Sequence, residues 1–475
     1  MRDKLRHYLY NKRSSWICKE SKISIARTLA GFLCDAAYTD LSSQSTDHAA
    51  MLIASTLASA AAGRDIPSAS IIRELVLERG GRPDGTVWFA RGVKLPVINA
   101  ARANALMSDA AASDDSDLRN ITHAGTPLTS ATLAMAEKNG ASGKDILAAI
   151  VLGYEAAGRI GASITPGYRQ RGFHACIIAI FSSAVAMGKL LGQDEVQMAS
   201  TLALSATSIG GLVAAGNETV SREYYAGLAT MLGMEAALAA HRGFVGEERV
   251  FEMPGGFCET YGAPEAGGSE ISAGIVKEMG DEWDIVTDMA IKLVPGSHFN
   301  HATAEAAANA ARKGNITPDE VARIIMSRPG TTRFSGPLHP RNLIDMAHST
   351  AYFLAASVAD HDFNWRHATQ EKIDDPTIHQ LIDKTEVGPE PTENVTAYRQ
   401  GAAVTIETTD GRSFSDVVLV PKGAGCRGIN WSDVDAKYRY LTPAALGSAE
   451  IDESLKLIHD FAQLSSVTDL MMLLQ

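Results

Sequence analysis

Apolar residues recur at helical spacing through most of the segment 20–280, where alanine is frequent and proline is sparse. The clearest case is 142–161, SGKDILAAIVLGYEAAGRIG, in which Ser142 can cap the first turn and Asp145 occupies the third helical position. The segments 194–216 and 226–243 are apolar on nearly every face, which is typical of buried helices. The pattern therefore predicts a densely packed, all-helical body.

The pattern changes near residue 282. Residues 283–296, WDIVTDMAIKLVPG, are rich in β-branched and apolar residues and predict a strand. Residues 317–330 predict a capped turn followed by a short strand. Two alternating arms within 396–420 flank Asp410-Gly411, a dipeptide typical of a hairpin turn.

Helical periodicity returns after residue 425, and the last 26 residues form an amphipathic pattern with no core of their own. The sequence therefore predicts a mainly α fold. A large helical domain is expected from both chain ends, 1–281 and 426–475. A smaller α+β lid domain, 282–425, is expected as an insertion between them.

Composition narrows the class of protein. The 475 residues carry a net charge of −12, which argues against nucleic acid and anionic membranes as partners. The longest uncharged run, Val196 to Asn217, is rich in Ser, Thr and Gly, so a buried helix is expected rather than a membrane span. The basic stretch 1–15 lacks the apolar core of a secretory signal. Five scattered cysteines without a CxxC pair favour a reducing, cytoplasmic location.

Common cofactor and catalytic motifs are missing from the sequence. It contains no GxGxxG after a strand, no GxxxxGK[ST], no HExxH and no GxSxG. No motif in the sequence indicates a binding site for a nucleotide, a metal ion or an organic cofactor, so none is expected.

Charge is concentrated instead in a few short clusters set between apolar segments. The first is SDDSDLRNITHAG, 113–125, which lies between two predicted helices. Taken alone, this stretch is most simply a solvated loop. Four further clusters place cationic, histidine or tyrosine side chains near the ends of predicted elements: Arg169, Arg171 and His174; Arg222; Lys292 and His298; and Tyr352. Capping or surface ion pairing would explain each one separately. Together they predict a cleft that binds a small polycarboxylate and moves a proton.

The order and spacing of several landmarks resemble the MmgE/PrpD family over nearly the whole chain. These landmarks are NALMSDAAASDDSDLRNITHAGTPL, GASGKDILAAIVLGYEAAGRIG, RGFH, AIKLVPGSHFNHATAEAAANAAR and NWSDVDAKY. The resemblance implies a helical domain with an inserted lid, a homodimer, and an active site between the two domains. It also implies one of three cofactor-independent activities, namely 2-methylcitrate dehydratase, cis-aconitate decarboxylase or iminodisuccinate epimerase.

The same resemblance implies roles for individual residues. It makes His123, His174, Lys292 and Tyr352 candidate catalytic groups. Candidate substrate-binding groups are Asp114, Asp115, Arg169, Arg171, Arg222 and His298.

Three departures from the family pattern bear on the reaction. Ala112 replaces the first aspartate of the acidic motif, Arg222 stands where the decarboxylase has lysine, and Ala175 replaces the proline of GFHP. A lyase would use such polar groups, whereas an epimerase needs only two acid/base groups on opposite faces of an α-carbon. The sequence therefore favours a dicarboxylate epimerase. A lyase of the same family and a non-catalytic binding protein remain the alternatives.

Overall fold

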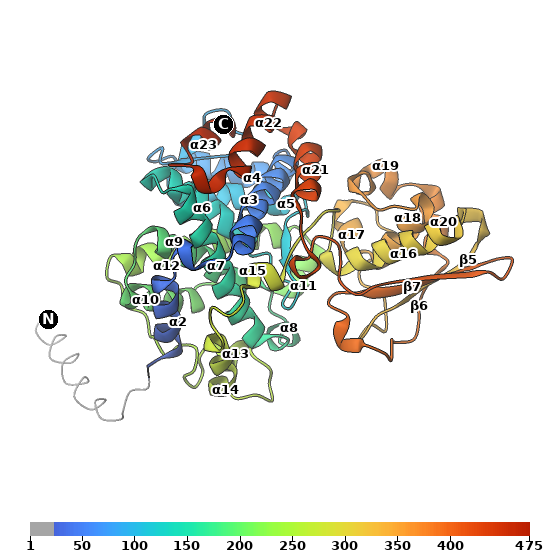
Figure 1. Cartoon of the computed structure of the whole chain (residues 1–475), viewed down its shortest axis with the longest axis horizontal. Coiled ribbons are helices and arrows are strands. Elements are labelled where there is room, and N and C mark those ends of the chain that lie inside the picture. Colours follow the sequence, from blue (N-terminus) through green and yellow to red (C-terminus); the bar gives the residue numbers. More distant parts are fainter. Residues whose placement is uncertain (1–22) are drawn as a thin grey trace, which may run out of the picture.

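The computed structural model describes residues 23–475, so the basic N-terminal stretch and Cys18 lie outside the described residues. The chain is mainly helical, with 59% helix and 8% strand, as the sequence predicts. Figure 1 shows a large helical body and a smaller α+β lid beside it. Their hydrophobic cores are separate, because one cluster gathers residues 26–291 and 434–474 and another gathers residues 302–418.

The helical body is built from both ends of the chain. Its larger helices are α2 Ile25–Asp35, α3 Ser43–Gly63, α4 Pro67–Arg79, α5 Val97–Ala110, α6 Gly125–Asn139, α7 Gly143–Ile164, α9 Cys176–Leu190, α10 Glu195–Ala206 and α12 Ser221–His241. Shorter helices are α8 Gly167–Gln170, α11 Val213–Glu218, α13 Phe257–Tyr261, α14 Gly268–Ala273 and α15 Asp284–Thr287. The C-terminal helices α21 Trp431–Leu441, α22 Ser448–His459 and α23 Thr468–Leu473 return to this body, and α21 and α22 pack against α3 (Figure 1).

Small residues allow these helices to pack closely. Ser142 and Asp145 form the expected capping box at the start of α7, and most of this helix is buried. Among the described residues, α7 is the one helix long and apolar enough to span a membrane. Its most apolar window is 83% buried inside the protein, as in the core helix of a globular domain. The run 196–217 is not one helix as expected, because α10 ends at Ala206 and α11 begins at Val213.

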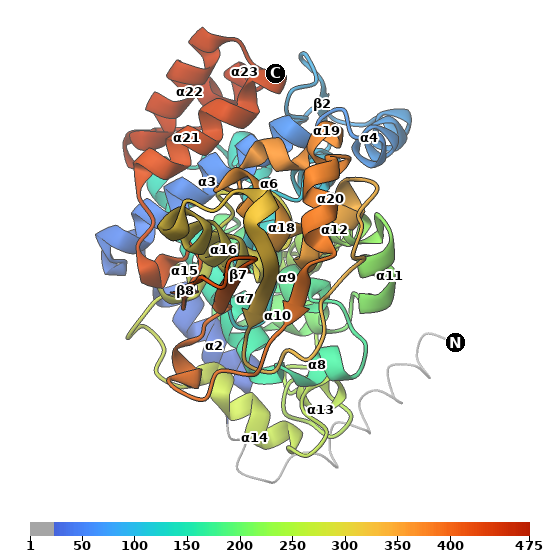
Figure 2. The same ribbon diagram turned by 90° about the vertical axis from the view of Figure 1, so that its right-hand side faces the viewer.

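The lid packs helices on a four-stranded sheet. Strands β5 Val321–Ser327, β6 Thr385–Val387, β7 Ala402–Thr408 and β8 Ser413–Val418 lie in the order β6-β5-β7-β8, and only the β5–β6 pair is parallel. The Asp410-Gly411 turn joins β7 to β8, and the Thr317 cap leads into β5, both as predicted. The lid helices are α16 His301–Gly314, α17 Leu343–His348, α18 Thr350–Asp360, α19 Gln370–Ile373 and α20 Pro376–Ile382 (Figure 2).

The segment 283–296 differs from its prediction. It contains the short helix α15 and then the three-residue strand β4, Met289–Ile291. This strand pairs with β3, Asp115–Asp117, and its apolar side chains lie in the core of the body. Residues 283–291 were assigned to the lid from their β-branched composition, but they pack with the body.

The return of the C-terminal segment onto the body depends on a close approach at Gly143. A Cβ added there would lie 1.7 Å from the carbonyl oxygen of Phe461. Gly143→Ala should therefore lower the free energy of unfolding by about 1–3 kcal/mol through overpacking. The matched control is Gly274→Ala, because a Cβ at Gly274 would meet nothing within 4 Å. Equal melting temperatures for the two variants would contradict this packing.

Candidate active site

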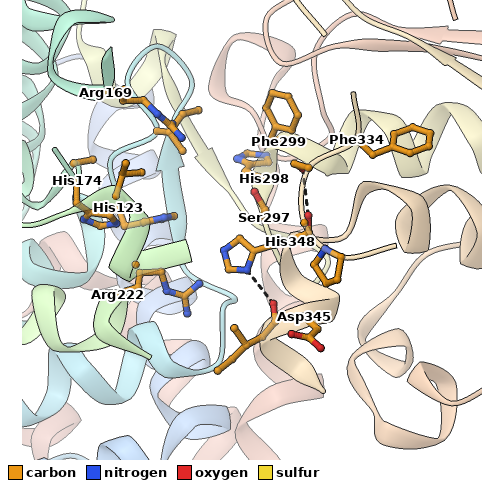
Figure 3. Close-up of a pocket in the computed structure, with 18 of the residues that line it drawn as sticks. His123, Arg169, His174, Arg222, Ser297, His298, Phe299, Phe334, Asp345 and His348 are labelled. Carbon is orange, nitrogen blue, oxygen red and sulfur yellow. Dashed lines mark hydrogen bonds between the residues drawn. The ribbon is translucent and has the colours of Figure 1, made fainter. Parts of the chain in front are cut away.

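A cavity of about 890 Å³ lies between the body and the lid (Figure 3). The body contributes residues around the starts of α9, α11 and α12, and the lid contributes 297–299, the loop 330–337 and α17. Among the side chains that the structure describes, Asp345 is the one carboxylate that lines the cavity. The five cationic side chains that line it are Arg169, Arg222, Lys292, Arg333 and Arg341. The cavity is therefore suited to a ligand with several negative charges.

The acidic stretch is a buried strand and not the solvated loop that it resembles in isolation. Strand β3 pairs antiparallel with β4, and this register places Asp114 beside Lys292. The Lys292 ammonium donates to the Asp114 carboxylate over 2.6 Å, and both side chains are only 1% exposed. A buried ion pair of this kind loses most of its hydration, so each charge depends on the other.

His123 completes the charged group at the cavity. Its Nδ1 lies 2.6 Å from the carbonyl oxygen of Asp115 and 2.9 Å from the Asp114 carboxylate, so Nδ1 carries a proton and Nε2 is left for a ligand. Burial alone would lower the pKa of His123, but the Asp114 carboxylate reverses this and raises the pKa above its usual value. The Asp114 carboxylate therefore favours the protonated form of His123, which can act as an acid.

The other two carboxylates of the stretch stabilise the fold. Asp115 accepts hydrogen bonds from the Gly125 backbone N–H at 3.0 Å and from the Tyr154 hydroxyl at 3.2 Å. Asp117 accepts from the backbone and the guanidinium of Arg119. Neither side chain lines the cavity, and Asp114 lies behind Lys292 and His123. The structure thus moves Asp114 and Asp115 from substrate contacts to positioning groups.

His174 lies beside His123 in the cavity (Figure 3). Its Nδ1 accepts the backbone N–H of Cys176 at the start of α9, so the ring proton is on Nε2. Burial lowers the pKa of His174 to about 3, and the nearby cations add to this effect. A neutral His174 offers the cavity an N–H donor rather than the free lone pair of a base.

His298 also lines the cavity and faces it without a partner. It is 2% exposed, and neither ring nitrogen has a hydrogen-bond partner among the described residues. Burial and the Lys292 charge lower its pKa to about 3. His298 can therefore exchange hydrogen bonds with a ligand in its neutral form.

Two arginines on the body face the same space. Arg222 Nε donates to the Asp109 carboxylate at 2.9 Å, which holds the guanidinium at the start of α12. Arg169 lines the cavity from α8 (Figure 3). The planar guanidinium group suits bidentate contact with a carboxylate.

Two further predicted residues, Tyr352 and Arg171, do not line the cavity. Tyr352 is fully buried in the lid core, where its hydroxyl donates to the carbonyl of His367. Arg171 instead donates to the carbonyl of Gly262. Both were proposed from motif position alone, and these contacts direct each side chain away from the cavity.

The structure adds Lys437, which was not among the predicted site residues. Lys437 is 2% exposed and donates to the Ser55 hydroxyl at 2.7 Å and to the carbonyl of Ser113, next to Asp114. Burial lowers the pKa of Lys437 to about 7. The one available sequence signal was its place in NWSDVDAKY, which is remote in sequence from the acidic stretch. Among the side chains that the structure describes, no group of three or more His, Cys, Asp or Glu could hold a metal ion.

A mainly helical body, an inserted lid and a cationic cavity between them define the architecture of the chain. Two domain descriptions of one family match most of its length. The MmgE/PrpD N-terminal domain matches residues 27–266, and the MmgE/PrpD C-terminal domain matches residues 295–461. The chain belongs to the MmgE/PrpD family.

Several curated proteins are similar to the chain over most of their length. Human "Cis-aconitate decarboxylase" is 24% identical over 404 residues, which cover 82% of this chain and 82% of that protein. "Cis-aconitate decarboxylase-like protein oryM" of Aspergillus oryzae is 25% identical over 74% of this chain and 77% of its own. "Cis-aconitate decarboxylase" of Aspergillus terreus is 24% identical over 81% of this chain and 82% of its own.

These relatives support the expectation of an enzyme and correct the expected reaction. Each is named for a decarboxylase, so the preference for an epimerase was wrong. The structure shows where two of the three departures that favoured an epimerase lie. Arg222 still presents a cation to the cavity, and Ala112 lines a different cavity. The homodimer and the cytoplasmic location stay predictions.

The lowered pKa of Lys437 has a consequence for stability. Between about pH 7 and its usual pKa of 10.5, the unfolded chain binds a proton that the folded chain releases, so Lys437 makes the protein more stable as pH rises. We expect the free energy of unfolding of the wild type, measured relative to Lys437→Met by denaturant titration, to increase from pH 7 to pH 9. Lys456→Met, at an exposed lysine of α22, should show no such trend. If the difference in unfolding free energy between the wild type and Lys437→Met did not change from pH 7 to pH 9, the lowered pKa would be refuted.

Proposed function

We propose that the protein is a lyase that removes CO₂ from a small tricarboxylate of the cis-aconitate type. One observation carries the proposal: a single cavity combines five cationic side chains with His123, whose charge is maintained by Asp114. The decarboxylase relatives support the same reaction class.

The chemistry requires a positioned anion and one proton. In cis-aconitate, one carboxylate is attached to a CH₂ group next to a carbon–carbon double bond. When this carboxylate leaves as CO₂, its bonding electron pair forms a new double bond to the central carbon. The electron pair of the old double bond then takes up a proton at its far carbon. An enzyme must therefore hold the two remaining carboxylates and supply that proton.

The cavity provides groups for both tasks. Arg169, Arg222 and Lys292 can hold the retained carboxylates, since these cations line the same cavity. His123 is the proposed acid, with Nε2 as the donating atom. His174 is proposed to donate its Nε2–H to a substrate oxygen.

The proposal predicts turnover that depends on His123. We expect cis-aconitate in D₂O to release CO₂, detected by capture, and to yield a product with one deuterium, detected by NMR. His123→Gln should lower kcat by about 10²-fold or more, because the acid is lost. His241→Gln, at an exposed histidine of α12, is the matched control.

Three outcomes would count against the proposal. Folded protein could release no CO₂ from cis-aconitate, or His123→Gln could lose less than tenfold. Loss of water from citrate or 2-methylcitrate, without CO₂ release from any tricarboxylate, would assign the chain to the dehydratases instead.

A further inference from the structure

A second cavity of about 670 Å³ continues the cleft between body and lid beyond the first. The two cavities share four residues, Gly216 and Arg222 from the body and Ile344 and His348 from the lid. We call this second cavity the annex. It lies next to the place where a bound carboxylate would meet Arg222.

The boundary between the two cavities is not closed by a bond from body to lid. Arg222 is bonded to Asp109 within the body, and His348 Nδ1 lies 2.9 Å from the carbonyl of Ile344 within the lid. Among the described residues, no hydrogen bond or ion pair joins Arg222 to His348. Figure 3 shows these two side chains on opposite sides of the cleft. A ligand chain can therefore extend between them into the annex.

The annex differs sharply from the first cavity in chemistry. Apolar side chains from α4, α5, the start of α12 and α17 make up most of its lining, among them Ile71, Ile72, Leu106, Ala110, Val220 and Leu343. Among the described side chains, the charged ones that line the annex are Arg222 and Glu223, and each already has a partner within the body, Asp109 and Ser68. The annex thus offers a ligand mainly apolar contacts, and the one cationic group that lines it is already paired.

From this arrangement we propose that the annex binds an alkyl chain carried by the substrate. The preferred substrate is then an alkyl-substituted polycarboxylate, with its carboxylates on Arg222 and Lys292 and its chain in the annex. This inference rests on the proposed function for the carboxylate end. Its physical basis is that one cavity is cationic and the other apolar. Carboxylates bind more favourably at the cationic cavity, and methylene groups bind more favourably where they displace water from apolar side chains.

The experiment measures binding and so does not depend on turnover. Calorimetric affinities would be compared for methyl-, butyl- and octylsuccinate, which share the dicarboxylate and differ in chain length. Each methylene that enters the annex should tighten binding by about three- to fourfold until the chain fills the available length. An affinity that does not change with chain length would overturn the inference.

A variant with a charge at the rim of the annex tests whether the alkyl chain of the ligand binds there. Ile71 is 62% exposed at the rim of the annex, so Ile71→Glu should fold and should abolish most of the gain from methyl- to octylsuccinate. The control is Leu77→Glu on the same helix, because Leu77 is 41% exposed and does not line the annex. A chain-length gain that survives in Ile71→Glu would show that the chain binds elsewhere and would also overturn the inference.

The two proposals fail in different ways. If cis-aconitate releases CO₂ but the alkyl series shows no gain, the reaction stands and the annex has another use. If the alkyl series shows the gain and Ile71→Glu removes it, but no tricarboxylate reacts, the annex assignment stands and the proposed reaction is wrong.

Discussion

The buried contact between Asp114 and Lys292 is the interaction on which the rest of the site depends. The two groups come from segments 178 residues apart and meet because β3 pairs with β4. Both side chains are only 1% exposed, so removing one partner would leave the other largely uncompensated at a cost of about 3–5 kcal/mol. The same carboxylate then lies 2.9 Å from His123 and raises its pKa.

This contact also explains why so much charge is placed within apolar helical sequence. Three aspartates share one short buried stretch, and each has a separate set of partners. Asp114 holds Lys292 and His123, Asp115 holds the start of α6, and Asp117 holds Arg119. Arg119 in turn pairs with Asp284 and Asp288. These contacts therefore hold the stretch 113–125, which carries His123, against the segment 284–292 that leads into the lid.

Local patterns predicted much of the fold, because caps, turns and periodicity act over a few residues. The α7 capping box and the Asp410-Gly411 hairpin are examples. Side-chain direction was harder to predict. Tyr352 and Arg171 match motif positions but turn away from the cavity, and Lys437 reaches Ser113 across 324 residues of sequence. Burial of the acidic stretch also depends on a strand pairing that no local pattern encodes.

The choice of reaction shows the same limit. Ala112 and Arg222 were treated as losses from a lyase site, yet Ala112 lines the annex and Arg222 keeps a cation at the cavity. A substitution within a motif has chemical meaning only when the direction of its side chain is known. Here the names of the relatives favour the lyase alternative, while the sequence departures alone favoured an epimerase.

The account depends most directly on the charge of His123. The decisive measurement is an NMR titration of the His123 ring in ¹⁵N-histidine-labelled protein, assigned by comparison with His123→Gln. The account predicts a midpoint above the usual value of 6.5, with the ring protonated at neutral pH. A midpoint at or below 6.5 would show that Asp114 does not stabilise the protonated ring, and it would contradict the account.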